Sequence, residues 1–383
     1  MAFTGAQFYS VMVGVVPLYV AILLGYGSVR WWKLVQEPQQ CVGIAQLNTY
    51  FLIPTYVFHV LAFNNPYTLS LRILAADFLS KAVPLCLLCV WAAVPSSLHS
   101  STKEEEEAAR RRKFDWAISF FMLATLPNTV IVGIPLLQPM YGKIAIQGSI
   151  CIISAQCLFW YNVCIVLFEV RAAQLQITAD MQLMIKANNN KKELILAQRQ
   201  KMHIMSAAAR GGGAALGRFS MLQQVCKRVL LRLLRLPILY GSVLGFTYSL
   251  LASRWGFNMP QIVEASLQIL TNMTLGASMF LLGLFMANQP NLLPCGLWKT
   301  VGGIVIRFGV GPAIMTIASV AVGIRGDSLR FVITQAAVPQ GIITFILANE
   351  YNMHADIFAT AVSFQTLIFL PFVLLYYILL GLL

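Results

Sequence analysis

The chain has 383 residues, of which 58% are hydrophobic and only 11% are charged, and its mean hydropathy is +0.73. This composition excludes a set of soluble domains, because apolar runs long enough to cross a bilayer recur along the whole chain. The net charge of +13 would suit a nucleic-acid-binding protein, but the basic residues gather in loops between apolar runs, where membrane topology explains them. We therefore expect an all-α, multi-pass membrane protein without a nucleic-acid partner.

Ten apolar segments are predicted to be transmembrane helices. They are 8–27, 43–62, 71–93, 115–137, 145–169, 235–253, 267–287, 297–321, 329–349 and 355–381. No Lys or Arg precedes Arg30, so the first segment lacks the charged start of a cleaved signal peptide and is expected to remain as a span. The charged run 103–113 is interpreted as a solvated loop, and the polar stretch 170–234 as a flexible linker with a short amphipathic helix at about 222–234.

Lysine and arginine counts predict the orientation. The loops after the odd-numbered spans, which include 170–234, hold 20 of these residues, whereas the loops on the opposite side hold five. Basic residues favour the cytoplasmic side. The long loop is therefore expected in the cytoplasm and both termini on the other side.

Two of the ten segments are interrupted at their centres. Pro127 and Asn128 break the fourth segment, and Pro339 and Gln340 break the ninth. Proline removes a backbone donor and clashes with the carbonyl four residues earlier, so neither segment is expected to be one continuous helix. Freed backbone groups at this depth must be satisfied by protein or by a water-filled cavity. Paired interruptions of this kind are typical of transporter substrate sites.

The two halves of the sequence resemble each other. Val16-Pro17-Leu18 matches Leu236-Pro237-Ile238 at an offset of 220, and Leu126-Pro127-Asn128 matches Val338-Pro339-Gln340 at an offset of 212. Each half holds five spans, an odd number, so the copies must be inverted relative to each other. The expected domains are a first repeat at 1–169, a cytoplasmic loop at 170–234 and a second repeat at 235–383, with the two broken helices crossing.

Such a crossing would favour a carboxylate. Helix N-termini after Pro127 and Pro339 would present unpaired N–H groups and positive dipole ends, and Asn128 and Gln340 would add neutral amide donors. The alternative is that these prolines only kink packed helices.

The remaining intramembrane polar groups leave several interpretations open. Asp77 and Lys81 lie four residues apart on one helix face. They could form a purely structural ion pair or act as a switch beside the substrate cavity. Arg307 either reaches the membrane interface or pairs across helices. Gln156, Trp160 and Tyr161 offer an amide and aromatic faces to a flat ligand, or simply pack. We find no enzyme motif or metal-ligand cluster, and expect neither catalysis, cofactor nor metal.

A set of motifs carries a family resemblance. They are Val16-Pro17-Leu18-Tyr19-Val20, Asn64-Asn65-Pro66, Leu126-Pro127-Asn128-Thr129, Leu158-Phe159-Trp160-Tyr161, Gly283-Leu284-Phe285-Met286-Ala287, Gly311-Pro312-Ala313, Gln335-Ala336-Ala337-Val338-Pro339-Gln340-Gly341 and Glu350-Tyr351-Asn352. Over nearly everything except about 172–230, the chain resembles the PIN-FORMED auxin efflux carriers, specifically their short-loop branch.

The resemblance implies the inverted-repeat fold of bile-acid symporter-like and sodium/proton-antiporter-like carriers. It implies a homodimer in which a scaffold domain (spans 1, 2, 6 and 7) supports a transport domain (spans 3–5 and 8–10) that moves like an elevator and exports indole-3-acetate without a coupling ion. Substrate-binding residues would be Val57, Asn128, Ile131, Gln156, Cys157, Tyr161 and Ile342, and Asp77 and Lys81 would form an ion pair at the cavity's edge. Endoplasmic reticulum and plasma membrane are both open as locations.

The sequence departs from that family's pattern near the second break. Thr344 stands where a proline is usual, Asn349 where a lysine is common, and His354-Ala355 replaces His-Pro. Two other functions stay open: a cation-coupled organic-anion symporter on the same fold, and a membrane receptor or scaffold that transports nothing.

Overall fold

The computed structural model describes residues 5–35, 38–94, 103–189, 226–227, 229–231, 234–289 and 294–382. Within these ranges the chain is helical, apart from turns and one isolated antiparallel β-bridge. Seven helices there are long and apolar enough to cross a membrane, and they contain residues 8–30, 39–62, 71–93, 143–176, 261–288, 297–321 and 355–382. The prediction of an all-α, multi-pass membrane protein is thus confirmed, whereas the inverted repeat stays a prediction.

The helices follow the expected segments closely. In the first half they are α1 (Gly5–Arg30), α2 (Pro38–Leu47), η1 (Asn48–Leu52), α3 (Ile53–Ala62), η2 (Pro66–Thr68), α4 (Leu71–Ala93), α5 (Lys103–Thr125), η3 (Thr129–Gly133), α6 (Ile134–Tyr141), α7 (Lys143–Ala155), η4 (Gln156–Trp160) and α8 (Tyr161–Asn189). In the second half they are α11 (Pro237–Trp255), α12 (Gln261–Asn288), α13 (Leu297–Val305), η5 (Ile306–Val310), α14 (Gly311–Ala321), α15 (Asp327–Ala336), α16 (Ile342–Glu350) and α17 (Ala355–Leu382).

Two helices extend further than the sequence predicts. α5 begins at Lys103 and so includes the charged run that we expected to be a loop, and α8 continues to Asn189, well into the expected linker. The α5 extension consists mainly of Glu, Arg, Ala and Lys, and the α8 extension is rich in Ala, Gln, Leu and Met; neither contains Gly or Pro, so helix propensity favours both. In α5 the four glutamates at 104–107 lie near the helix start, where negative charge complements the helix dipole. Most of the amphipathic helix expected at about 222–234 lies outside the described residues.

The chain forms two compact units. One contains residues 1–161 and 237–383, and the other contains residues 162–236. All sites discussed below lie in the first unit.

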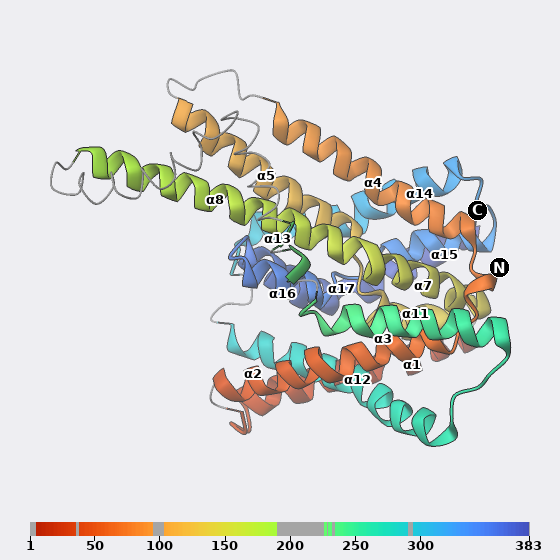
Figure 1. Ribbon diagram of the computed structural model, residues 1–383. Coiled ribbons are helices and arrows are strands. Elements are labelled where there is room, and N and C mark those ends of the chain that lie inside the picture. The colour runs from red at the N-terminus through yellow and green to blue at the C-terminus, as the bar shows by residue number, and fades with distance from the viewer. Residues whose placement is uncertain are drawn as a thin grey trace. The chain divides into compact units, whose positions relative to one another are not determined.

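Within the first unit, α1, α3, α11 and α12 pack closely, and we call them the glycine-packed group (Figure 1). α1 lies along α12, and α3 lies along α11. A side chain at Gly25 of α1 would overlap the Phe280 carbonyl of α12, and one at Gly283 would overlap the Ile22 carbonyl of α1. Gly245 of α11 contacts Phe58 of α3 in the same way. Small residues that let backbones approach are the usual means of holding membrane helices together.

A second set of helices forms the crossing group, which comprises α4 to α7 with η3 and η4, and α13 to α17 with η5. α4 packs against α5 and α14, α15 against α7, α14 and α17, and α16 against α17. The largest fully buried side chains include Trp160, Phe121 and, unusually, the charged Arg307 and Lys81. Charged groups are rarely buried without partners, so their positions indicate where the polar centre of the protein lies.

We expect Gly283→Ala to destabilise the protein, because the added methyl group must displace the α1 backbone, at a cost of about 1–3 kcal/mol. Gly276→Ala is the matched control: it lies on the same helix with nothing within 4 Å of the added carbon. Thermal unfolding of both variants in detergent should show a lower Tm for the first and an unchanged or slightly higher Tm for the second. Equal melting temperatures would contradict the close α1–α12 contact.

Candidate functional site

The two interruptions expected at Pro127 and Pro339 are present, and they meet. α5 ends at Thr125 and α15 at Ala336, and the segments that follow run antiparallel to each other, with a bridge between Pro127 and Gln340. The Asn128 N–H donates to the Pro339 carbonyl at 2.8 Å, and the Gly341 N–H donates to the Leu126 carbonyl at 3.4 Å. Each break thus satisfies part of the backbone that the other break leaves unpaired.

Asn128 caps the helix that follows the first break. Its Oδ1 accepts from the Ile131 N–H at 3.4 Å, and its carbonyl accepts from the Val132 and Gly133 N–H groups. The side chain is 6% exposed, and its Nδ2 has no hydrogen-bond partner among the described residues. A buried amide group with two unused donor hydrogens is therefore available at this break.

Gln340, at the second break, has a different role from the one we expected. Its Nε2 donates to the Met122 carbonyl at 3.1 Å and to Thr344 Oγ1 at 2.8 Å, so both amide hydrogens are used inside the protein. Thr344 Oγ1 in turn donates to the Gly341 carbonyl at 2.6 Å. The threonine that departs from the family's pattern thus takes part in holding the break, and Gln340 is not a free donor for a ligand.

Two further glutamines hold the breaks from the last helix of each half. Gln156 Nε2, in η4, donates to the Pro127 carbonyl at 3.3 Å. Gln365 Oε1, in α17, accepts from the Gln340 backbone N–H at 3.2 Å. Gln335 also bridges the halves, because its Nε2 donates to Thr129 Oγ1 at 2.8 Å. The sequence pattern alone gave no binding or structural role to Gln335 or Gln365, although a glutamine inside an apolar span indicates that a buried partner exists.

Asp77 and Lys81 form the expected ion pair on α4. Lys81 Nζ lies 2.5 Å from Asp77 Oδ1, and both side chains are almost completely buried. Lys81 Nζ also lies 5.8 Å from the centre of the Trp160 ring. The second carboxylate oxygen, Oδ2, has no hydrogen-bond partner among the described residues, so the pair retains an unused acceptor.

Arg307, in the π-helical turn η5, pairs across helices and does not reach the membrane interface. It is completely buried. Its guanidinium donates to four backbone carbonyls, those of Leu123, Ala124, Ala336 and Val338, at 2.6–3.2 Å. Three of these carbonyls belong to the ends of α5 and α15, directly before the two breaks, and the fourth, that of Val338, lies within the second break.

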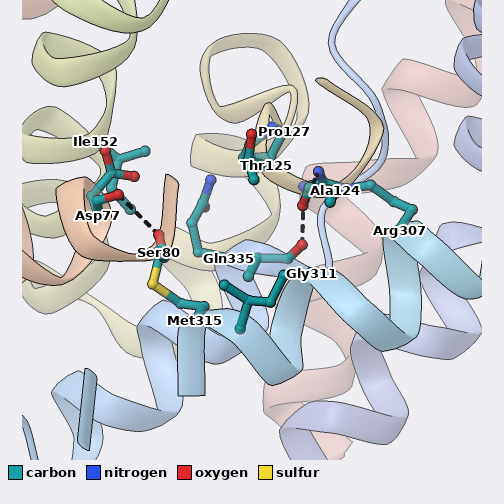
Figure 2. Close-up of a pocket in the computed structure, with 12 residues that line it drawn as sticks. Asp77, Ser80, Ala124, Thr125, Pro127, Ile152, Arg307, Gly311, Met315 and Gln335 are labelled. Carbon is teal, nitrogen blue, oxygen red and sulfur yellow. Dashed lines mark hydrogen bonds between the residues drawn. The ribbon is translucent and has the colours of Figure 1, made fainter. Parts of the chain in front are cut away.

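A small cavity with both polar and apolar lining residues lies beside the crossing. Figure 2 shows Asp77 and Ser80 on one side and Arg307 extending toward Ala124 on the other. Its volume of about 20 Å³ has room for about one water molecule. An indole ring does not fit there. A larger groove of about 440 Å³ between α4, α5 and α14 is almost entirely apolar and contains none of the predicted binding residues.

The predicted substrate-binding residues are all buried, with exposed fractions of 0–6%. Asn128 and Ile131 lie at the first break, and Ile342 begins α16 directly after the second. Gln156 and Cys157 lie in the π-helical turn η4, and Tyr161 follows it. Val57 lies on α3, in the glycine-packed group. That group touches the crossing group mainly where α1 packs against α6, and also where α3 meets α7 and where α11 meets η4.

Three of the groups discussed above lie in or next to π-helical turns. Asn128 precedes η3, Gln156 and Cys157 begin η4, and Arg307 lies in η5. Such turns are frequent at functional sites, because they redirect side chains out of the regular helical register. No group of three or more His, Cys, Asp or Glu side chains that could hold a metal ion is found in the part of the chain that the structure describes.

Comparison with known proteins gives a consistent result. Residues 10–377 match the family of membrane transport proteins. The chain is 39% identical to the probable auxin efflux carrier component 5b of Oryza sativa subsp. japonica, over 97% of both chains. It is 35% identical to the auxin efflux carrier component 5 of Arabidopsis thaliana, over 96% of both. It is 34% identical to the probable auxin efflux carrier component 9 of Oryza sativa subsp. japonica, over 99% of this chain and 100% of that one. The chain therefore belongs to the PIN-FORMED family of auxin efflux carriers, within the membrane transport proteins.

We expect Thr344→Val to weaken the second break. Valine keeps the shape but removes the hydroxyl that joins Gln340 to Gly341, at a cost of about 1–3 kcal/mol for the donor left unpaired. Thr366→Val, in α17, removes a hydroxyl that only donates to the carbonyl one turn earlier, and should cost less. Thermal unfolding compares the two, and an equal loss in Tm would show that the Thr344 hydroxyl has no special role.

Proposed function

We propose that this member of the PIN-FORMED family exports the indole-3-acetate anion by alternating access, as a uniporter driven by the membrane potential. The relatives' names, which describe auxin efflux carriers, support the substrate class. The observation that carries the proposal is the side-chain amide of Asn128, whose Nδ2 hydrogens are available to a ligand. This residue lies directly before η3, where the two broken helices meet.

The carboxylate is the part of the ligand that this crossing recognises. Indole-3-acetate is ionised near neutral pH, as other carboxylic acids are. Asn128 Nδ2 offers a neutral donor, and the beginnings of η3 and α16 add positive dipole ends. Because none of these groups carries a full charge, the site binds an anion without holding it so strongly that release becomes slow.

The indole ring requires apolar and aromatic surface next to this donor. Ile131, Cys157 and Ile342 provide small apolar surfaces around the crossing, Gln156 provides an amide, and Tyr161 provides an aromatic face. We assign Val57 to the opposite wall, on the glycine-packed group. The ring would thus lie between the two helix groups, outside the small cavity beside Arg307.

The motion we propose is an elevator in which the crossing group moves against the glycine-packed group. These groups correspond to the transport and scaffold domains expected from the sequence. Supporting this, the crossing's hydrogen bonds from Asn128, Gln340 and Arg307 all end within the crossing group. Contacts between the groups include aromatic pairs such as Phe285 with Phe345, at 5.7 Å. Sliding apolar surfaces past each other leaves the polar centre intact.

Matching contacts in the two halves support an inverted five-plus-five repeat. Ser154, Gln156 and Leu158 match Ser363, Gln365 and Leu367 at an offset of 209. Gln156 contacts the break of the first half, and Gln365 contacts the break of the second half. Gly25 and Gly245, which share the offset of 220 that relates Pro17 to Pro237, are each packed against a neighbouring backbone. With this repeat, the long loop would be cytoplasmic and both termini would lie on the other side.

We further propose a homodimer and a supporting role for the Asp77–Lys81 pair beside the site.

Asn128→Asp should abolish export with little effect on folding. The aspartate retains the oxygen that caps η3, loses the amide donor and places a negative charge where the carboxylate binds. Asn128→Ala is a less selective change, because it also removes the cap, which is worth about 1 kcal/mol. Asn272→Ala, exposed on α12, is the control.

The measurement is release of labelled indole-3-acetate from loaded cells, with surface or organelle expression checked for each variant. Export by a well-folded Asn128→Asp protein at the wild-type rate would refute the proposed donor.

Transport in proteoliposomes should follow the membrane potential without a gradient of sodium or protons. A monoanion gains about 2.3 kcal/mol from 100 mV, sufficient for roughly fortyfold accumulation. Empty vesicles under the same potential are the control. Uptake at zero potential that follows an imposed sodium or proton gradient would identify a symporter, and binding without any flux would identify a receptor.

A further inference from the structure

Arg307 has an environment that the proposed substrate contacts do not explain. Its side chain is completely buried, and its four hydrogen bonds all go to neutral backbone carbonyls. Among the described residues, no salt bridge joins Arg307 to a carboxylate; its hydrogen-bond acceptors are all backbone carbonyls. A buried cation without an acidic partner is expensive, and such residues usually serve function.

The carbonyls that Arg307 contacts are not random backbone groups. Leu123 and Ala124 lie in the last turn of α5, Ala336 is the last residue of α15, and Val338 lies within the second break. The last carbonyls of a helix have no intrahelical partner and carry the negative end of the helix dipole. Arg307 therefore binds the negative ends of both half-helices at once.

This arrangement changes the electrostatic potential of the crossing. The positive starts of η3 and α16 face the same small volume as the negative ends of α5 and α15, so the partial charges alone would largely cancel. Each negative end is equivalent to about half an elementary charge, so one full positive charge on the carbonyl side roughly balances the two. The positive ends then dominate, and the crossing attracts an anion. The Asp77 carboxylate borders the same cavity, but its charge is paired with Lys81.

We propose that Arg307 is a positioning residue for anion recognition: without touching the substrate, its charge makes the crossing selective for a carboxylate over a neutral ligand of the same shape. The hydrogen bonds of its guanidinium to carbonyls of α5 and α15 also hold the ends of these two helices together. This inference rests on the proposed function, because the anion is the one that the crossing transports.

Two substitutions separate the charge from the hydrogen bonds. Arg307→Gln removes the charge but keeps an amide that can donate to carbonyls, whereas Arg307→Lys keeps the charge with fewer directed donors. Gln365→Met is the control, because it loosens the crossing at Gln340 and Gly303 without changing any charge. The probes are indole-3-acetate and the uncharged indole-3-acetamide, with binding measured by calorimetry on the full-length protein in nanodiscs.

Wild type should prefer the anion. Arg307→Gln should lower the ratio of anion to amide affinity about tenfold, which is the order expected for one nearby charge in a medium less polar than water. Arg307→Lys and Gln365→Met should retain the ratio even where both lower the Tm.

A purely structural arginine would instead lower both affinities by the same factor in Arg307→Gln, and that result would overturn the proposal. If Arg307→Gln does not fold, Arg307→Lys decides: a retained ratio supports the proposal, and a ratio that falls to one overturns it. The wild-type measurement tests the proposed function separately from the variants. If the wild-type protein binds neither probe, the proposed function is refuted.

Discussion

The structure depends on satisfying the backbone groups that two prolines leave unpaired inside a membrane. Lipid offers no hydrogen bonds, so each freed carbonyl and N–H must find a partner in the protein. The two breaks provide part of the answer by pairing with each other through Asn128 and Gly341. Gln156, Gln365 and Arg307 provide the rest from neighbouring helices. The polar side chains buried at the centre of this apolar protein are therefore a consequence of where its helices break.

The same requirement limits what the site can bind. Most donors at the crossing are already used, including both amide hydrogens of Gln340. The donors left for a ligand are the Asn128 amide and the N–H groups at the positive starts of η3 and α16. These groups suit one carboxylate and no large polar ligand, so the remainder of a substrate must be apolar. An aromatic ring carrying a short carboxylate side chain meets both conditions.

The sequence predicted the parts of this arrangement that local patterns encode. Proline within an apolar run identified both breaks, and the four-residue spacing identified the Asp77–Lys81 pair. It did not predict the role of Arg307, because that residue contacts carbonyls 29 to 184 positions away in the chain, and backbone carbonyls carry no sequence signature. It also missed the helical extensions of α5 and α8, since charged residues such as Glu, Lys and Arg are typical of both solvated loops and exposed helices.

The distribution of hydrogen bonds bears on how such a site could move. A polar network that crossed a sliding interface would have to break during each transport cycle and leave buried groups unpaired, at about 1–3 kcal/mol for each. Here Arg307 and Gln340 make their bonds within one group of helices, whereas Tyr19 of α1 stacks on Phe369 of α17 across the boundary. The Tyr19 hydroxyl also donates to the Leu367 carbonyl across that boundary, so movement there would break this one hydrogen bond. Moving the crossing as a rigid unit would therefore cost few hydrogen bonds, and in the proposed elevator the charge of Arg307 would travel with the bound anion.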